Sequence, residues 1–199
     1  IQIKMRLLLL LCSLLAVSNV NAQPEPHVRV ELLPAVTSIA PGDSFDVVFR
    51  QDIDDEWHTY WTNPGDSGAA PDIKWTVSEG VVVSDFQYPY PERIPYGPLM
   101  NYGYHTEVLM PFSVSVPKDF SANVVELKGT GRVLVCADIC IPEKVEVRAS
   151  IPIGATIPDA AAFDTFLAAR ASVPVPIDVA SSFRVVGDKI LLTVGLPVV

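Results

Sequence analysis

Cys136 and Cys140 are the residues of this sequence whose types and spacing most directly suggest chemistry. Three residues separate them, and the segments on both sides have the composition of β-strands. A disulfide between them closes a ring of about five residues, which stabilises a fold by about 2 kcal/mol, against about 4.7 kcal/mol for a loop of about 100 residues. Small strained rings are also more easily reduced. The spacing therefore favours a disulfide that exchanges electrons over one that only stabilises the fold.

Two other interpretations of the cysteine pair stay open. A structural bridge in a non-enzymatic β-sandwich binding module predicts a reduction potential below about −300 mV and no exchange with redox partners. A copper-binding or copper-delivery protein would combine both thiolates with His58 or His105, because thiolate and imidazole are ligands that copper accepts. A closed structural zinc site needs four ligands, and the sequence has no second cysteine pair for it. The redox interpretation requires no cofactor and no metal.

A carboxylate lies between the two cysteines. Thiol–disulfide exchange requires a thiolate that attacks a disulfide sulfur, so the pKa of the thiol and its accessibility decide the rate. The negative charge of Asp138 disfavours a nearby thiolate. We therefore expect Asp138 to modulate the thiol pKa and to hold the reduced pair back from indiscriminate reaction.

The segments that must position these residues have the pattern of short β-strands. Apolar residues alternate with polar ones, and turn residues recur about every 8 to 12 positions. No helical segment alternates with the strands, which disfavours a βαβ arrangement. The pattern predicts an all-β fold, an immunoglobulin-like antiparallel β-sandwich. The predicted strands are residues 27–32, 44–51, 57–61, 73–77, 81–87, 107–116, 122–128, 132–135 and 144–153.

One segment inside this region does not have a strand pattern. Residues 88–98 contain four prolines in eleven positions, which predicts a long loop. The loop leads into residues 101–105, Asn-Tyr-Gly-Tyr-His, which we expect to form an aromatic tip before the next strand. Long loops in compact domains are usually functional or disordered, and the aromatic residues favour the ordered case.

The two ends of the chain have a different character. Residues 1–22 combine basic residues, a short apolar run and small residues before Gln23, as in a secretory signal peptide that leads to the periplasm. Residues 23–153 form the predicted redox domain, and residues 154–180 a short helix and a Pro-rich linker. Residues 181–199 read as a hairpin with a two-residue turn, which we interpret as the truncated start of a second β domain in a longer protein.

The charge of the chain excludes one class of partner. The sequence has 23 acidic and 14 basic side chains and a formal net charge of −9. Such a chain lacks the positive surface that binds the phosphate backbone. The composition therefore excludes nucleic acid as a partner.

Three segments together resemble one known family. These are the Cys-Ala-Asp-Ile-Cys-Ile-Pro run of residues 136–142, the Pro-rich residues 88–95 and the Asn-Tyr-Gly-Tyr run of residues 101–104. They resemble the periplasmic N-terminal domain of the thiol:disulfide interchange protein DsbD, particularly its ScsB-like branch, over roughly residues 28–153. The three-residue spacer between the cysteines is shorter than in the best-known members and matches the ScsB-like branch.

The resemblance implies a function and specific roles. Such a domain takes electrons from a membrane-embedded domain of the same full-length protein, which also has a thioredoxin-like domain, and reduces periplasmic disulfide proteins with a thioredoxin fold. Cys140 would form the mixed disulfide with a partner, and Cys136 would be its internal partner. A cap loop with an aromatic tip would cover the cysteines, with Tyr102 or Tyr104 as the shield and Gly103 between them.

Overall fold

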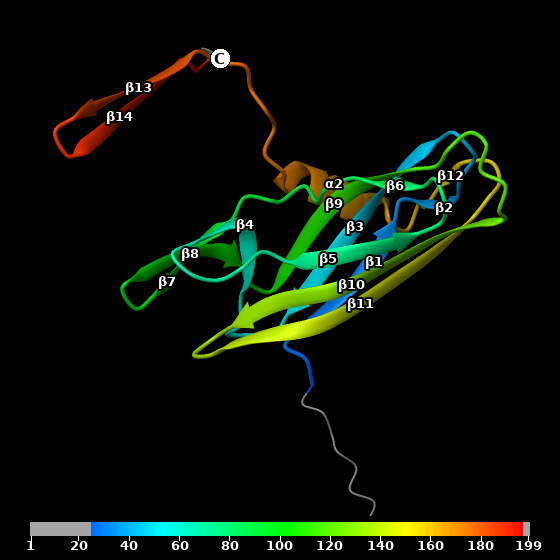
Figure 1. The fold of residues 1–199 in the computed structure, drawn as a ribbon, viewed down its shortest axis with the longest axis horizontal. Coiled ribbons are helices and arrows are strands. Elements are labelled where there is room, and N and C mark those ends of the chain that lie inside the picture. The colour runs from blue at the N-terminus through cyan, green and yellow to red at the C-terminus, as the bar shows by residue number, and fades with distance from the viewer. Residues whose placement is uncertain (1–24, 197–199) are drawn as a thin grey trace, which may run out of the picture.

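Most of the described chain forms antiparallel β-strands (Figure 1). The structure is a computed structural model that describes residues 25–196. The predicted signal peptide, residues 1–22, lies outside the described residues. The all-β fold predicted from the alternating segments is confirmed. Across residues 25–196, none of the helical structure is long and apolar enough to cross a membrane.

Two antiparallel sheets pack face to face and form the sandwich. The first sheet has the strand order β1-β3-β9-β6, and the second has the order β11-β10-β5. Along most of their length the strands follow the period-two pattern, in which one face is buried against the opposite sheet. The middle parts of β3 and β9 are exceptions, because three consecutive residues are buried in each. The strands of the first sheet are β1 (Val28–Pro34), β3 (Ser44–Ile53), β9 (Glu107–Ser115) and β6 (Val82–Val83), and those of the second are β11 (Cys140–Pro152), β10 (Val124–Cys136) and β5 (Asp72–Val77).

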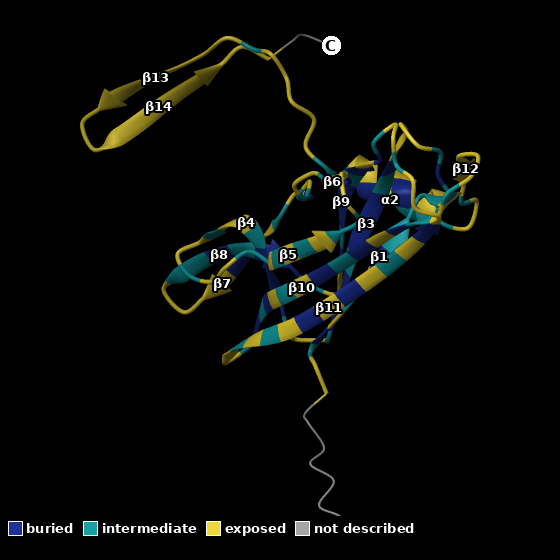
Figure 2. Ribbon diagram, turned by 45° about the vertical axis from the view of Figure 1, so that its right-hand side comes forward, coloured by how far each residue is buried: buried dark blue, intermediate teal, exposed yellow. Residues whose placement is uncertain are grey.

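The core of the sandwich lies between these sheets. Phe49 and Phe112 from the first sheet share one buried cluster with Val125 and Leu127 from the second, and all four are almost completely buried. The ring of Trp75 on β5 packs 5.1 Å from that of Phe112, centroid to centroid. Figure 2 shows buried and exposed residues alternating along β10 and β11. This burial holds the cysteine-bearing hairpin on a rigid support.

Strand β10 is longer than the sequence pattern predicts. The two segments predicted as separate strands, residues 122–128 and 132–135, form one continuous strand that pairs with β11 along its whole length. The glycines between them do not end the strand, because they allow β5 to approach. A Cβ atom on Gly131 would lie 1.9 Å from the Asp72 carbonyl oxygen, and one on Gly129 would lie 2.8 Å from the Trp75 ring.

A third sheet lies beside the sandwich and contains the Pro-rich segment. Its strand order is β4-β8-β7, formed by β4 (Thr59–Gly65), β8 (Leu99–Tyr104) and β7 (Glu92–Tyr96). The prediction of a continuous loop over residues 88–98 is therefore wrong. β7 is an edge strand, where Pro95 can be accommodated without breaking an internal ladder. The predicted aromatic tip at residues 101–105 is also wrong, because most of it belongs to β8 and the hairpin turns at Gly97.

Two further strand boundaries differ from the pattern. The predicted strand over residues 81–87 shortens to β6, although the backbone of Ser84 and Gln87 still donates hydrogen bonds to β9. Pro111 on β9 has no backbone N–H and cannot donate a hydrogen bond to residues 84–87. The hydrogen-bond ladder between this segment and β9 is therefore interrupted at Pro111. Strand β4 continues through residues 63–65, which the sequence pattern places in a turn, with an irregular register against β8.

The segment after the sandwich forms a helix on the outer face of the first sheet. β2 (Val36–Ser38) and β12 (Ile157–Pro158) pair with each other, and helix α2 (Phe163–Ser172) follows. Phe166 and Ala169 pack on Val48, which points away from the main core. The helix begins slightly later than Asp159 predicts. Asp159 accepts a hydrogen bond from the Ala161 N–H and does not act as the N-cap residue.

The predicted hairpin after the linker is present. β13 (Ser181–Val186) and β14 (Lys189–Val194) pair around a two-residue turn in which Gly187 has φ +62°. Every residue of both strands is exposed (Figure 2). On one face of the hairpin, the two neighbouring register pairs Phe183–Leu192 and Val185–Ile190 consist of apolar residues. The hairpin therefore receives no support from the sandwich core.

Candidate functional site

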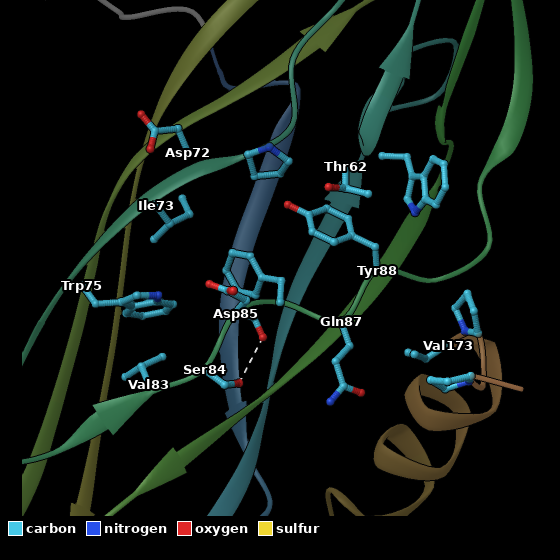
Figure 3. Close-up of a pocket in the computed structure, with 15 residues that line it drawn as sticks. Thr62, Asp72, Ile73, Trp75, Val83, Ser84, Asp85, Gln87, Tyr88 and Val173 are labelled. Carbon is cyan, nitrogen blue, oxygen red and sulfur yellow. Dashed lines mark hydrogen bonds between the residues drawn. The ribbon is translucent and has the colours of Figure 1, made fainter. Parts of the chain in front are cut away.

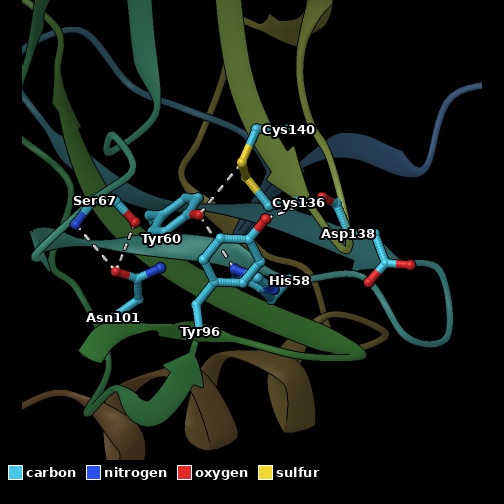
Figure 4. The surroundings of a disulfide bond; sticks show 8 residues. All are labelled: His58, Tyr60, Ser67, Tyr96, Asn101, Cys136, Asp138 and Cys140. Atoms are coloured by element: carbon cyan, nitrogen blue, oxygen red, sulfur yellow. Dashed lines mark hydrogen bonds between the residues drawn. A yellow bond between two sulfur atoms is a disulfide. The ribbon is translucent and has the colours of Figure 1, made fainter. Parts of the chain in front are cut away.

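The two cysteines end the long β10–β11 hairpin. Cys136 and Cys140 are the last register pair of the hairpin, and residues 137–139 form the turn between them. The Ala137 N–H donates a 2.9 Å hydrogen bond to the Ile139 carbonyl and tightens this turn. The two Cα atoms are 4.1 Å apart, and the sulfur atoms form a disulfide (Figure 4). The hairpin thus brings together the pair that the sequence singles out.

The two cysteines differ sharply in their access to solvent. Cys136 is 1 % exposed, whereas Cys140 belongs to the exposed residues. Cys136 also pairs with His58, the residue that precedes β4. His58 and Cys136 exchange two backbone hydrogen bonds, of 2.9 and 3.0 Å. Of the two cysteines, Cys140 is therefore the one that is open to solvent.

The same backbone bridge places a buried tyrosine under the disulfide. Tyr60, two residues beyond His58, is 1 % exposed. Its hydroxyl oxygen lies 3.9 Å from the Cys140 sulfur and 3.2 Å from Nε2 of His58 (Figure 4). Burial raises the pKa of Tyr60, and Tyr96 contributes in the same direction. The hydroxyl therefore stays protonated and can donate a hydrogen bond.

His58 is itself buried and lies beside a second histidine. The centroids of the His58 and His105 rings are 5.7 Å apart. Burial lowers the pKa of His58, and the charge of His105 lowers it further. Nδ1 of His105 lies 3.1 Å from a carboxylate oxygen of Glu92 on β7. His58 is therefore neutral at pH 7, where its Nε2 can accept a proton.

A tyrosine at the tip of the β7–β8 hairpin covers the cysteine turn. The Tyr96 hydroxyl donates a 3.0 Å hydrogen bond to the backbone carbonyl of Asp138 (Figure 4). Tyr96 is 39 % exposed, so it lies over the turn without being locked in the core. A groove of about 440 Å³ runs between this hairpin and the cysteine turn. It is lined by Glu56, His58, Ile94, Pro95, Tyr96, His105, Ala137 and Asp138.

The residues predicted for the cap lie farther along β8. Tyr104 is buried, and its hydroxyl donates a 2.9 Å hydrogen bond to the Pro89 carbonyl. Burial raises the pKa of Tyr104 strongly. Gly103 allows the backbones of β8 and β4 to approach, since a Cβ there would lie 1.9 Å from the Thr59 carbonyl oxygen. Tyr102 is half-buried next to Gly65. A shielding role for Tyr102 or Tyr104 stays a prediction.

Tyr60 and Tyr96 are not among the site residues that the sequence predicts. Tyr96 precedes a Gly-Pro pair inside the Pro-rich segment, and that pair is a turn signal that could have located the hairpin tip. Tyr60 belongs to an aromatic strand whose pattern resembles ordinary core. Its position under Cys140 depends on the pairing of β4 with the end of β10, and the sequence pattern does not show this.

The described side chains do not form a ready-made metal site. Among residues 25–196, no three His, Cys, Asp or Glu side chains converge as ligands for an ion. His58 and His105 approach each other, but His105 pairs with Glu92 and His58 with Tyr60. The copper interpretation therefore gains no support from the geometry.

A larger groove lies elsewhere on the sandwich (Figure 3). It has a volume of about 900 Å³ and shares no residue with the groove at the cysteine turn. One wall consists of β5 and the segment after β6, and the other includes the start of the linker after α2. Trp75 and Tyr88 line it together with Val173 and Pro174. Phe86 packs against both aromatic rings, so this groove continues the aromatic core.

Fold and site together define an immunoglobulin-like β-sandwich that has a solvent-accessible disulfide across the end of a hairpin. The family model for the N-terminal domain of the thiol:disulfide interchange protein DsbD matches residues 29–152. The chain therefore belongs to this family, as the resemblance implies, and is a thiol–disulfide interchange domain. A comparison with curated protein sequences finds no significant match.

One solved structure of the same type supports the fold. The N-terminal periplasmic domain of ScsB from Proteus mirabilis superposes with a TM-score of 0.64 at 21 % identity, over 87 % of this chain and 66 % of that one. The chain therefore spans slightly less than two thirds of the ScsB domain. The reduced DsbD N-terminal domain of Neisseria meningitidis gives a TM-score of 0.33 at 17 % identity, over 64 % of this chain and 90 % of that one. The complex of the DsbD and PilB N-terminal domains from Neisseria meningitidis gives 0.35 at 16 % identity, over 71 % of this chain and 96 % of that one.

Proposed function

We propose that this domain passes electron pairs between proteins through Cys140 and Cys136. The unequal exposure of the two cysteines supports this assignment most strongly. In the step that reduces the oxidised domain, the thiolate of a donor protein attacks the Cys140 sulfur. The Cys136–Cys140 bond breaks, and Cys136 leaves as a thiolate. The second thiolate of the donor then attacks the donor sulfur that is bonded to Cys140, and Cys140 is released as a thiolate. The donor becomes a disulfide, and the domain gains two electrons.

In the second half of the cycle the domain reduces a target. The Cys140 thiolate attacks the target disulfide and displaces one target thiolate. Cys136 then attacks the Cys140 sulfur, which re-forms the domain disulfide and releases the second target thiolate. We infer that Asp138 in the turn disfavours premature thiolate formation, because its charge lies within the ring of the two cysteines. Tyr96, which is bonded to the Asp138 carbonyl, is a candidate for the shield that limits access.

The direction of electron flow and the partners are also part of this proposal. Family membership supports a donor in the membrane-embedded and thioredoxin-like parts of the same full-length protein, and periplasmic targets with a thioredoxin fold. The related ScsB domain is periplasmic, and residues 1–22 have the pattern of an export signal. We place this domain in the periplasm, as a protein-disulfide reductase module. Residues 154–180 would link the redox domain to a second β domain that starts at residue 181.

Trapping of mixed disulfides tests the proposal. A Cys136→Ala variant retains the exposed sulfur but cannot resolve the intermediate, so we expect a covalent adduct through Cys140 with a thioredoxin-fold disulfide protein. The adduct should disappear on addition of dithiothreitol, as seen by non-reducing electrophoresis. Cys140→Ala is the matched control and should trap little, because Cys136 is buried. Equal trapping by Cys140→Ala, with none by Cys136→Ala, would reverse the roles of the two cysteines.

A further inference from the structure

We propose that Tyr60 and His58 form a relay that carries a proton between the Cys140 sulfur and the groove beside it. This inference rests on the proposed exchange function, and it assigns a role to two residues that the exchange steps do not use. Tyr60 would be the group that touches the reacting sulfur. His58 would act through Tyr60, as the acceptor and donor at the groove end.

The geometry makes a continuous path. The Tyr60 hydroxyl is 3.9 Å from the Cys140 sulfur, within reach of the longer hydrogen bonds that sulfur forms, and 3.2 Å from Nε2 of His58. A buried hydroxyl requires hydrogen-bond partners. Within residues 25–196, the partners of the Tyr60 hydroxyl are the Cys140 sulfur and Nε2 of His58. The backbone of His58 is fixed to that of Cys136 by two hydrogen bonds. The relay therefore keeps its position relative to the cysteine turn when the disulfide opens.

The outer end of the relay meets solvent through the groove. His58 lines this groove together with Glu56, Tyr96, His105 and Asp138. These residues come from the segment before β4, from β7, from the residue after β8 and from the cysteine turn, and they are the titratable residues that line the groove with His58. The Tyr60 hydroxyl faces the His58 ring from the inner side. Glu92 lies behind His105, at 3.1 Å from its Nδ1. A proton that reaches His58 therefore has an exit to solvent.

The relay accounts for the proton that the Cys140 thiol must lose before it attacks a target disulfide. The Cys140 thiol gives its proton to the Tyr60 oxygen while Tyr60 gives its own proton to Nε2 of a neutral His58. The Cys140 thiolate then attacks the target disulfide, one target thiolate leaves, and the imidazolium of His58 releases its proton to the groove. When a donor reduces the domain, the same path runs backwards and returns a proton to the departing Cys140 thiolate. Two electrons move with the disulfide exchange, and the relay moves only the proton.

The proposal requires His58 to be neutral at working pH. Burial and the neighbouring His105 lower the pKa of His58 from its ordinary value of 6.5. Its base form is therefore present at pH 7 and is lost as the pH falls through that lowered pKa. Proton acceptance by a positioned base typically accelerates such a step by about 10² to 10⁴, and a partly exposed thiol should show the lower end of that range.

The rate of the reduced protein with a small aromatic disulfide, 5,5′-dithiobis(2-nitrobenzoate), tests the relay between pH 4.5 and 10. Tyr60→Phe removes only the hydroxyl, and His58→Gln removes the titrating ring. At pH 7 we expect both variants to react about tenfold more slowly than the natural chain and to lose the inflection at acidic pH. Near pH 10 the thiol ionises without help, so the rates should converge. Tyr88→Phe, in the separate aromatic groove, is the matched control and should keep the natural profile.

The outcomes separate the relay from the exchange function. Variants that keep the natural rate and pH profile overturn the relay, while mixed-disulfide trapping by Cys136→Ala would still support the exchange function. Variants that stay slow at pH 10 also overturn it, since that result indicates damage to the fold around Cys140. A natural chain that reacts with no disulfide at any pH overturns both proposals.

Discussion

At the scale of single residues, the site combines one accessible sulfur with aromatic and titratable side chains close to it. Cys140 is exposed and Cys136 is buried, and we therefore expect partners to attack Cys140. Tyr96 lies over the turn between them and donates a hydrogen bond to the Asp138 carbonyl. We therefore expect access to the disulfide to depend on the contact between Tyr96 and Asp138.

We predict that Tyr96→Ala opens the site. Without the ring and its hydrogen bond, dithiothreitol should reduce the disulfide a few-fold faster, because the ring no longer restricts the approach to the cysteine turn. Tyr96→Phe retains the ring and should show a smaller effect. The reduction rate can be followed by thiol release, with Tyr90→Ala as the control, since Tyr90 is an exposed aromatic residue that does not line the groove. An unchanged rate in Tyr96→Ala would remove this residue from the shield.

At the scale of elements, the β10–β11 hairpin determines where the chemistry happens. Its thirteen register pairs run from Val124 to Cys136, and its central part is buried against the first sheet. β5 closes the other edge of β10 across Gly129 and Gly131. The close approach of β5 depends on the missing side chains at these positions.

We predict that Gly131→Ala weakens the second sheet. The new Cβ would meet the Asp72 carbonyl oxygen at 1.9 Å, so β5 must move away, at a cost of about 1–3 kcal/mol in the free energy of unfolding. Urea denaturation measures this change. Gly154→Ala is the matched control, because its Cβ would meet only Ser38, at 3.8 Å. Equal stability of the two variants would show that β5 does not depend on this contact.

At the scale of the whole molecule, the sandwich and the terminal hairpin are energetically separate. Helix α2 packs on the sandwich through Phe166 and Ala169, whereas all residues of β13 and β14 are exposed. A lone two-stranded hairpin is marginally stable in water. The stability of the redox domain should therefore come from residues up to the end of α2.

We predict that a chain ending at residue 180 keeps the redox domain intact. Removal of β13 and β14 takes away no buried contact of the core, so the thermal midpoint of the sandwich should change by less than about 2 °C. The rate of reduction by dithiothreitol should also stay the same. Differential scanning calorimetry and thiol release measure the two quantities. A clear drop in the midpoint would reveal a contact between the hairpin and the sandwich.

The sequence pattern predicted the elements that rest on local periodicity. Strands such as β1, β3 and β9 largely follow the period-two alternation, which depends on which face of a strand meets the core. The β13–β14 hairpin follows from the turn residues Gly187 and Asp188 between two strand-like segments. The sequence pattern failed at Pro95 and at Gly131. A sequence pattern treats proline and glycine as strand breaks. An edge strand nevertheless accommodates a proline, and the close approach of two strands requires a glycine. Both exceptions depend on neighbours that are distant in the sequence.

The sequence by itself determined the class of fold and the spacing of Cys136 and Cys140, because these depend on local pattern and on residue type. Only the tertiary structure decided which sulfur is exposed and which side chains surround it. Tyr60 lies 80 positions before its contact Cys140, and His58 lies 78 positions before its contact Cys136. Such contacts arise from the pairing of strands across the fold, and the pairing is set by the packing of the whole core.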